Sequence, residues 1–388
     1  AFLGVELTLD DEPGLSVVAV RPRGAAAAAD VRVGDRLLAL AGRAVDDHAS
    51  LRAAVGALAP ARAVEFTIRR GDADVLLTGP LLPTPLEVVP GARVTLDHVV
   101  ADGRRLRTLY TQPLRGGPCP AVLLLPGLAC ESCERPFEPS HPAVRLLAGF
   151  TAAGVATLRV ERRGLGDSDG PPCHESDLDA EVAGFRAGLR QLRSRPLVDP
   201  DNILLFGHSL GGMIAPLVAH GLGARRVVVY GASAARWSAC VLGSALRHAD
   251  LRPEGPAAAQ LAALLTALLD DEASPAALLT ARPALRRAAT AVGVTRDGRM
   301  RGRALALFRQ LERVDLAAAW RRLGAEVRAL HGDRDLVTTE GDAAEIARLT
   351  GGEHRELPGL DHGWRSSDGS DPIAALVAAT LAPRTSRA

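Results

Sequence analysis

The chain has 388 residues, of which 47% are hydrophobic and 23% charged, the balance of an ordinary globular protein. Its formal net charge of +1 provides no overall attraction to nucleic acid or to an acidic partner. No apolar run in the sequence is long enough to cross a bilayer, so no transmembrane segment is predicted, and the length leaves room for two or three domains.

The first 80 residues have the pattern of short strands separated by glycine-marked turns. One helix is predicted near 48–58, because Leu51, Val55 and Leu58 recur on one face, and the alanine-rich segment 24–30 predicts a short helical turn. The predicted strands lie at 3–9, 16–20, 36–40, 63–69 and 74–77.

Three stretches of this region, FLGVEL, VVAVRPRGAAAAADVRVGDRLLALAGRAV and EFTIRRGD, resemble a bacterial PDZ domain over nearly all of residues 1–80. The resemblance implies a loop whose backbone N–H groups receive the C-terminal carboxylate of a peptide, which then adds as a strand to the sheet edge. The matching positions are Phe2, Leu3, Gly4 and Val5. The alternative is a module that serves only as a spacer or packs on the rest of the protein.

Four prolines and two glycines crowd into residues 79–91, a composition typical of a semi-rigid linker. We therefore place a PDZ-like, β-rich domain at 1–83, a proline-rich linker at 84–91 and a second domain at 92–388.

Strands and helices alternate in this second domain, which predicts a mostly parallel sheet covered by helices, and its two opening strands predict an antiparallel edge. Strands are expected at 94–99, 106–110, 121–125, 156–160, 203–206, 226–230, 326–330 and 354–357. Helices are expected at 143–153, 178–193, 213–220, 341–349 and 373–381. Between about 236 and 320 the strand signal disappears and prolines break the chain into short helices, which predicts a helical lid.

Ser209 lies in the segment Gly207-His208-Ser209-Leu210-Gly211, between an apolar strand and a helix. This is the context of a G-x-S-x-G nucleophile elbow, in which a tight turn lifts the serine hydroxyl above the sheet. This elbow and the turn ERRGLGDS at 161–168 make residues 91–385 resemble a serine hydrolase of the α/β-hydrolase superfamily. In that fold the partners of the serine follow in the order acid, then histidine.

His362 follows the last predicted strand and is the expected base, whereas His354 lies within that strand and should point elsewhere. Asp335, in the loop after 326–330, matches the acid of the G-x-x-D element, with Asp333 as the fallback. The aspartate not used is expected to be a solvated charge or a partner of Arg334. His208 is expected to support the elbow or to line the pocket.

An oxyanion hole requires two backbone N–H groups directed at the developing charge. Leu210, directly after the serine, is one expected donor. Leu128, in the loop after strand 121–125, is the other by resemblance to the HG-x turn of the family, although Pro126 replaces the frequent histidine.

The five cysteines are expected to be mainly packing residues, with a Cys133–Cys173 disulfide as the sharper alternative. No metal or organic cofactor is implied, since the mechanism is complete without one. The expected activity is hydrolysis of a carboxylic ester or thioester, and a small-molecule or acyl substrate is the expected partner. A serine peptidase or aminopeptidase is the alternative, and a non-catalytic PDZ scaffold ranks below both. The compartment stays open, although bacterial PDZ modules of this kind favour the envelope or secretion.

Overall fold

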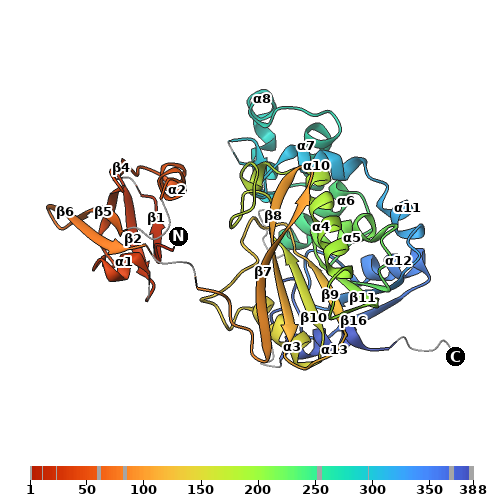
Figure 1. Cartoon of the computed structure of the whole chain (residues 1–388). Helices are drawn as coiled ribbons and strands as arrows, with labels where there is room; N and C mark the ends of the chain where they lie inside the picture. Colours follow the sequence, from red (N-terminus) through yellow and green to blue (C-terminus); the bar gives the residue numbers. More distant parts are fainter. Residues whose placement is uncertain are drawn as a thin grey trace. The chain divides into compact units, whose positions relative to one another are not determined.

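The computed structural model describes residues 2–10, 12–22, 24–58, 63–81, 85–250, 256–295, 297–366 and 371–383. The chain divides into two compact units, residues 1–86 and 87–388 (Figure 1). The division falls inside the predicted linker 84–91. Glu87 and Val89 are buried in the second unit, so residues 87–91 pack with that unit instead of bridging the two.

The first unit is an antiparallel sheet with two short helices. Its strands run in the order β1-β2-β3-β5-β6, with β4 beside β3, so β1 and β6 form the edges. Leu15, Leu37 and Phe66 are buried between the sheet and the helices. The elements are β1 (Val5–Thr8), β2 (Leu15–Val20), α1 (Ala25–Ala28), β3 (Arg36–Leu40), β4 (Arg43–Ala44), α2 (His48–Gly56), β5 (Ala63–Arg70) and β6 (Ala73–Pro80).

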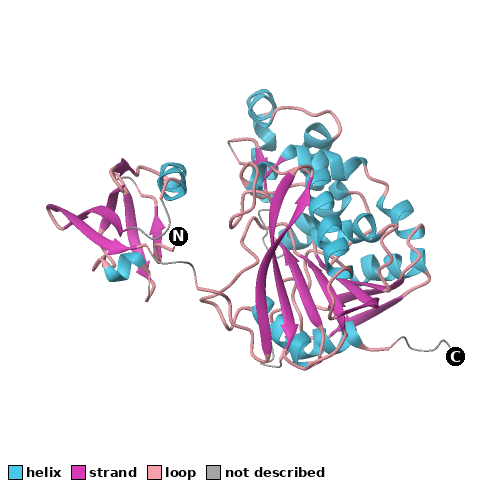
Figure 2. Ribbon diagram, in the orientation of Figure 1, coloured by secondary structure: helices cyan, strands magenta, loops and turns pink. Residues whose placement is uncertain are grey.

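The second unit is built on a mixed sheet of eight strands in the order β16-β15-β12-β11-β9-β10-β8-β7 (Figure 2). Strand β7 pairs antiparallel with β8 and β8 with β10, and all other pairs are parallel, which confirms the predicted antiparallel edge. The strands are β7 (Ala92–Ala101), β8 (Arg104–Pro113), β9 (Cys119–Leu125), β10 (Ala156–Val160), β11 (Val198–His208), β12 (Arg226–Tyr230), β15 (Glu326–Gly332) and β16 (Glu353–Leu357).

Helices cover both faces of this sheet (Figure 1). On one face lie α4 (Leu178–Arg193), α5 (Leu210–Ala219) and α12 (Glu340–Thr350), and on the other lie α3 (Pro142–Ala152) and α13 (Pro372–Leu381). Helix α4 begins where sequence analysis places it, because the Asp177 side chain caps the N–H of Ala180 and one apolar face is buried.

The segment after β12 forms short helices, as expected, but also a two-stranded hairpin that the sequence analysis missed. Its helices are α6 (Trp237–Asp250), α7 (Ala258–Leu269), α8 (Pro275–Ala281), η2 (Pro283–Leu285), α9 (Arg286–Ala291), α10 (Leu305–Arg313) and α11 (Leu316–Arg321). The hairpin strands, β13 (Arg299–Met300) and β14 (Arg303–Ala304), have two residues each, too few for an alternating pattern to appear in the sequence.

Two other boundaries differ from the prediction for physical reasons. Strand β11 starts at Val198, because Val198 already pairs with Cys119 of β9, and a register shift follows before Ile203 pairs with Ala121. Helix α5 starts at Leu210, so it contains two glycines that disfavour a helix in isolation but that close packing requires here.

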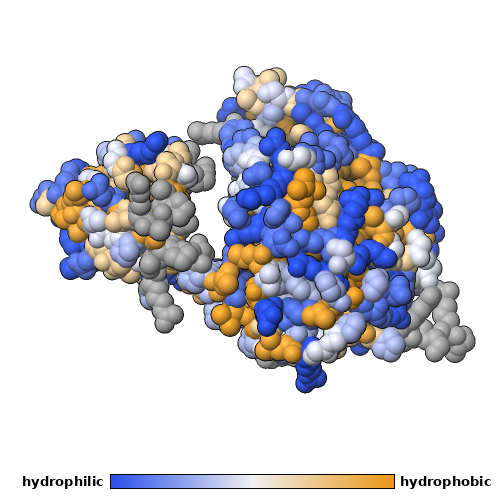
Figure 3. Space-filling view, in the orientation of Figure 1, coloured by the Kyte–Doolittle hydropathy of each residue, from blue (hydrophilic) through white to orange (hydrophobic). Residues whose placement is uncertain are grey.

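The visible face of the second unit mixes hydrophilic and hydrophobic residues (Figure 3), as protein surfaces commonly do. Among the helices in the described ranges, none combines the length and hydropathy needed to cross a membrane.

Candidate active site

Ser209 occupies a strained turn at the junction of β11 and α5. Its backbone φ of 53° and ψ of −121° are rare for a residue with a side chain, and its N–H donates to the carbonyl of Tyr230 at 2.9 Å. A Cβ at Gly207 would lie 2.7 Å from the Gly211 oxygen, and one at Gly211 would lie 2.2 Å from the Leu125 oxygen. Glycine is therefore required at both positions, and the predicted elbow is the observed local structure.

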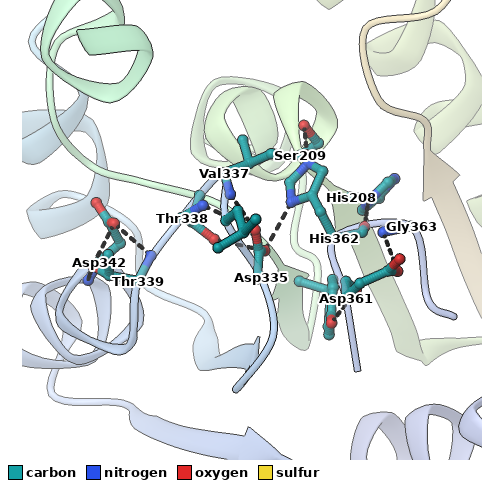
Figure 4. A network of polar contacts seen from close by, with 12 residues as sticks. His208, Ser209, Asp335, Val337, Thr338, Thr339, Asp342, Asp361, His362 and Gly363 are labelled. Carbon is teal, nitrogen blue, oxygen red and sulfur yellow. Dashed lines mark hydrogen bonds and ion pairs between the residues drawn. The ribbon is translucent and has the colours of Figure 1, made fainter. Parts of the chain in front are cut away.

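His362 and Asp335 converge on this serine from the loops after β16 and β15 (Figure 4). The His362 Nε2 atom lies 2.9 Å from the Ser209 Oγ, and Nδ1 lies 2.8 Å from the Asp335 Oδ2. With the proton on Nδ1, the imidazole donates to the carboxylate and accepts from the hydroxyl. The three side chains that the sequence singles out are therefore brought into one line of hydrogen bonds.

Asp335 is almost fully buried and receives several hydrogen bonds. Its Oδ1 accepts the N–H groups of Val337 at 2.6 Å and Thr338 at 3.0 Å, and its Oδ2 accepts the Thr338 hydroxyl at 2.9 Å (Figure 4). Burial alone would raise the pKa of this carboxyl, but the hydrogen bond from His362, the charge of His362 and the two backbone N–H groups together hold the pKa below its usual value. The group is thus kept ionised beside the imidazole.

The two alternative residues lie elsewhere. The Asp333 carboxylate lies at the surface, as expected for a solvated charge, and accepts the N–H of Gly359 at 2.7 Å, which holds the loop that carries His362. His354 lies in β16 at the surface, 3.8 Å from a carboxylate oxygen of Glu340.

His208 packs behind the imidazole of His362. Its Nε2 lies 2.8 Å from the backbone carbonyl oxygen of His362, which can only accept, so this nitrogen carries the proton. Its ring also contacts Trp364, with the ring centroids 4.6 Å apart. Burial, followed by the nearby charge of His362, lowers the pKa of His208 to about 4. His208 is therefore neutral near pH 7 and holds the loop of the second histidine.

Sequence analysis overlooked Gly231, at the end of β12. Its φ is 61°, and a Cβ there would lie 2.8 Å from the His362 ring and 3.0 Å from the Asp335 carboxylate. A side chain at this position would collide with both groups. The glycine after strand 226–230 was the available signal, but only the packing shows what it makes room for.

The loop that carries Leu128 lies beside the serine, since a Cβ at Gly127 would be 3.5 Å from the Ser209 Cβ. Arg162 donates to the carbonyl oxygens of Gly127, at 2.5 Å, and Ala129, at 2.8 Å. Arg303, from β14, donates to the Leu128 carbonyl at 3.1 Å. The carbonyls of this loop therefore point toward the side chains of Arg162 and Arg303.

Both arginines converge on a single buried carboxylate, that of Glu181 in α4. Its Oε2 is 2.8 Å from Arg162 Nε, and its Oε1 is 2.5 Å from Arg303 Nη2. Burial would raise the pKa of Glu181, but the two arginines lower it below its usual range. Sequence analysis did not predict this cluster, because Arg162 and Arg303 lie 19 and 122 residues from Glu181 along the chain.

A cavity of about 580 Å³ opens in front of Ser209. Apolar side chains from the core strands and from α6 line most of it, together with Ser209, His362 and the loop of Leu128. Its volume is in the range of small-molecule sites. In the described part of the chain, no group of three His, Cys, Asp or Glu side chains is arranged to hold a metal ion.

The expectation that the cysteines mainly pack fails for Cys130 and Cys173, which form a disulfide, and the alternative Cys133–Cys173 pairing is wrong. Cys133 is instead held by its backbone, whose N–H lies 3.2 Å from the Glu161 carboxylate and whose carbonyl oxygen accepts from Arg159 at 2.5 Å. Burial raises the pKa of the Cys133 thiol far above its usual range. Two cysteines three residues apart cannot be distinguished by sequence, because the course of the loop decides which of them faces Cys173.

In the first unit, the predicted carboxylate-binding loop packs against Gly24. The carbonyls of Leu3 and Gly4 accept backbone N–H groups from Ala26 at 2.8 Å and Arg21 at 2.7 Å. Gly4 has a φ of 73°, and a Cβ there would lie 2.7 Å from the Gly24 Cα. The loop thus keeps its carbonyls turned toward the domain.

Comparison with known proteins agrees with this architecture. Residues 122–379 match the model of the alpha/beta hydrolase family, and residues 1–79 match that of the PDZ domain. A thiohydrolase of Arthrinium phaeospermum is 34% identical over 131 residues, which are 34% of this chain and 38% of that protein. A polyketide transferase of Stachybotrys chlorohalonatus is 34% identical over 32% of this chain and 38% of its own length. The matched region is therefore well under two thirds of either relative.

Among solved structures, Est1E of Butyrivibrio proteoclasticus with ferulic acid bound superposes with a TM-score of 0.51 at 17% identity. The superposition covers 72% of this chain and 96% of Est1E, and at this identity it shows the fold alone. The family match spans most of the second unit and agrees with the strand order found there. The chain belongs to the alpha/beta hydrolase family and carries a PDZ domain in residues 1–79.

Proposed function

We propose that the second unit hydrolyses a carboxylic ester or thioester through an acyl-serine intermediate. The observation that carries the proposal is the unbroken line of hydrogen bonds from Ser209 through His362 to Asp335. An isolated serine hydroxyl is a poor nucleophile, and a base at hydrogen-bond distance activates it.

In the first half of the reaction, the Ser209 Oγ attacks the carbonyl carbon while its proton passes to the His362 Nε2. The resulting imidazolium is stabilised by Asp335, and its proton then goes to the leaving alcohol or thiol as that bond breaks. In the second half, His362 takes a proton from water, the hydroxide attacks the acyl-serine, and the proton returns to the Ser209 Oγ as the acid departs.

The N–H groups of Leu128 and Leu210 are proposed to bind the oxyanion. Leu210 opens helix α5, where the first N–H groups have no intrahelical acceptor. Arg162 and Arg303 occupy the carbonyls of the Leu128 loop, and this supports an orientation that leaves its N–H groups for the substrate.

A fluorophosphonate probe tests the nucleophile directly. We expect stoichiometric labelling of the wild type and no labelling of Ser209→Ala. Ser244→Ala is the control and should be fully labelled, because Ser244 lines the same cavity but has no catalytic base beside it. Labelling that persists in Ser209→Ala, or is absent from the wild type, would refute the assignment of Ser209 as the nucleophile. Hydrolysis of p-nitrophenyl acyl esters and matched acyl thioesters, but not of peptide anilides, would separate this activity from a peptidase.

The names of the two relatives, a thiohydrolase and a polyketide transferase, both fit an acyl-enzyme that is resolved by water or by another nucleophile. We propose water for this chain. Addition of alcohols during turnover checks this, because a transferase would divert most of the acyl group to the alcohol at low concentration.

We propose that the insertion at 236–320 acts as the lid of the cavity and selects the acyl chain. Trp237 and Val241 from α6 and Arg301 from the hairpin line the cavity. Trp237→Ala should shift the preferred chain length in a p-nitrophenyl ester series, whereas an unchanged preference would refute the role in selection.

For the PDZ domain we propose capture of a peptide C-terminus at Phe2, Leu3, Gly4 and Val5, with the peptide added to the β1 edge of the sheet. Fluorescence anisotropy of the full chain with labelled peptides tests this. Binding should be lost when the peptide carboxylate is amidated, and Gly4→Ala should weaken it. Equal binding of the free acid and the amide would exclude carboxylate capture.

A further inference from the structure

Arg301 stands at the tip of the β13–β14 hairpin, in an unusual backbone conformation. Met300 pairs with Arg303, so the turn consists only of Arg301 and Gly302, with φ values of 50° and 76°. Such two-residue turns require positive φ at both positions and strongly prefer Asn-Gly or Gly-Gly. An arginine there costs free energy, and strain of this kind concentrates at binding and catalytic sites.

The hairpin is fixed to the body of the domain. Met300 is fully buried in the core, and Arg303 forms the ion pair with buried Glu181. The N–H of Arg301 itself donates to the Gly293 carbonyl at 2.7 Å. A Cβ at Gly293 would lie 3.3 Å from the Arg301 Cγ, so a glycine there leaves space for the arginine stem. The position of Arg301 is therefore set by the fold.

The Arg301 side chain lines the cavity that contains Ser209, next to α6. The Cys240 thiol lines the same cavity and is neutral near pH 7, because burial raises its pKa to about 11. Trp237 and Ser244 lie about one helical turn before and after Cys240 and also face the cavity. The cavity leaves the side chain accessible to solvent, yet surrounding protein atoms lower the pKa of the guanidinium by desolvation.

Arg159 and Arg162, which also line this cavity, are neutralised by protein carboxylates. Arg159 pairs with Glu87 at 2.9 Å, and Arg162 pairs with Glu181 at 2.8 Å. Arg301, like Arg365, has no ion pair or side-chain hydrogen bond to any residue in the described ranges, and desolvation lowers the pKa of Arg301. A partly desolvated cation without a partner is unfavourable unless an anion joins it. The missing partner is available from the substrate, which enters the same cavity.

We propose that Arg301 binds a carboxylate on the substrate, so that the enzyme selects esters or thioesters that carry a second, anionic carboxyl group. This rests on the proposed acyl-serine chemistry and names the substrate class for that site. A planar guanidinium can hold a carboxylate by two parallel hydrogen bonds, which fixes the remote end of the substrate while the scissile carbonyl meets Ser209. The apolar lining between them suits an aliphatic or aromatic connector.

The test compares matched esters. In one series, p-nitrophenyl esters of ω-carboxyalkanoic acids are compared with the same compounds capped as ω-methyl esters. In the other, carboxyphenyl acetates are compared with their methyl-capped forms, so the two series place the carboxylate on either side of the scissile bond. We expect the wild type to favour the free carboxylate in one series by roughly 10- to 100-fold in kcat/KM, the range for a hydrogen-bonded charge pair.

Arg301→Gln should abolish this preference, and Arg301→Lys should retain part of it. Arg365→Gln is the matched control, because Arg365 also lines the cavity and is exposed. It should keep the ratio of the two kcat/KM values.

The proposal is overturned if the wild type shows no preference in either series, if Arg301→Gln keeps the preference, or if Arg365→Gln removes it instead. Failure of the wild type to hydrolyse even the capped esters would contradict the proposed function itself. In that case, calorimetry of Ser209→Ala with an ω-carboxy acid and its capped form still decides whether Arg301 binds a carboxylate.

Discussion

The Nε2–H of His208 donates a hydrogen bond of 2.8 Å to the backbone carbonyl oxygen of His362. The residue before the nucleophile therefore fixes the loop that carries the imidazole. Desolvation of the ring, and not this hydrogen bond, lowers the pKa of His208, and this shift makes the stability of the second unit depend on pH.

The first prediction concerns this pH dependence. The pKa of His208 is about 4 in the folded protein and about 6.5 in the unfolded chain. The unfolded state therefore binds the proton first as the pH falls, and the stability contributed by the neutral ring is full above pH 6.5 and lost between pH 6.5 and pH 4. His208 should account for a fall of about 2 kcal/mol in the free energy of unfolding between pH 7 and pH 5.

His208→Gln is the control for this experiment, since the amide keeps a donor but does not titrate. Urea unfolding followed by tryptophan emission reports on the second unit alone, because Trp237, Trp320 and Trp364 all lie there. The fall between pH 7 and pH 5 should be smaller in the variant by about 2 kcal/mol. An identical fall in both proteins would show that the titration of His208 does not cause the pH dependence of the free energy of unfolding.

The second prediction separates the two aspartates of the β15 loop. Asp335→Asn should lower kcat by roughly a thousand- to ten-thousand-fold with KM little changed, because the amide no longer stabilises the imidazolium or fixes its tautomer. Asp333→Asn should keep nearly full activity, since an amide oxygen can still accept the N–H of Gly359. Equal losses in the two variants would contradict the assignment of Asp335.

The third prediction concerns the arginines behind the Leu128 loop. Arg162→Met removes the donors to the Gly127 and Ala129 carbonyls, and we expect a loss of about ten- to a hundred-fold in kcat with a neutral ester, because one oxyanion donor is no longer held in place. Arg163→Met is the matched control, since Arg163 pairs with Asp102. Comparable losses in kcat for the two variants would show that Arg162 does not position the oxyanion donor of the Leu128 loop.

Glu181→Gln tests the same cluster through stability. Neutralising this carboxylate leaves Arg162 and Arg303 buried without their counter-charge, which should lower the free energy of unfolding by about 3 to 5 kcal/mol. Urea titration of the wild type and the variant at pH 7 measures the difference. A change below about 1 kcal/mol would mean that other groups neutralise the two arginines.

The fourth prediction concerns the disulfide between Cys130 and Cys173, which closes a loop with a sequence separation of 43. Its loss in Cys173→Ser should reduce the free energy of unfolding by roughly 2 to 4 kcal/mol, largely through the entropy of the unfolded chain. Peptide mapping without reduction gives the pairing. Cys133→Ser should keep the link to the Cys173 peptide, and Cys130→Ser should lose it.

The local pattern of the sequence was sufficient for the PDZ resemblance, the strands of the eight-stranded sheet with the helices that cover it, and the elbow at Ser209. These features depend on residues that are close along the chain: an apolar strand, a glycine turn and a helix follow one another between 203 and 219. The order of the elements also indicated His362 and Asp335, because the family places its acid and base after particular strands.

Only the tertiary structure decided which groups meet. Three of these contacts link segments that are distant in the sequence. Cys173 bonds to Cys130 instead of Cys133, and Gly231 leaves space for the His362 ring. Arg162 and Arg303 both pair with Glu181. A hairpin with strands of two residues leaves no periodic signal, so the placement of Arg301 on the cavity could not be predicted either. Local propensity specifies turns and elements, whereas partners across the core are specified by packing.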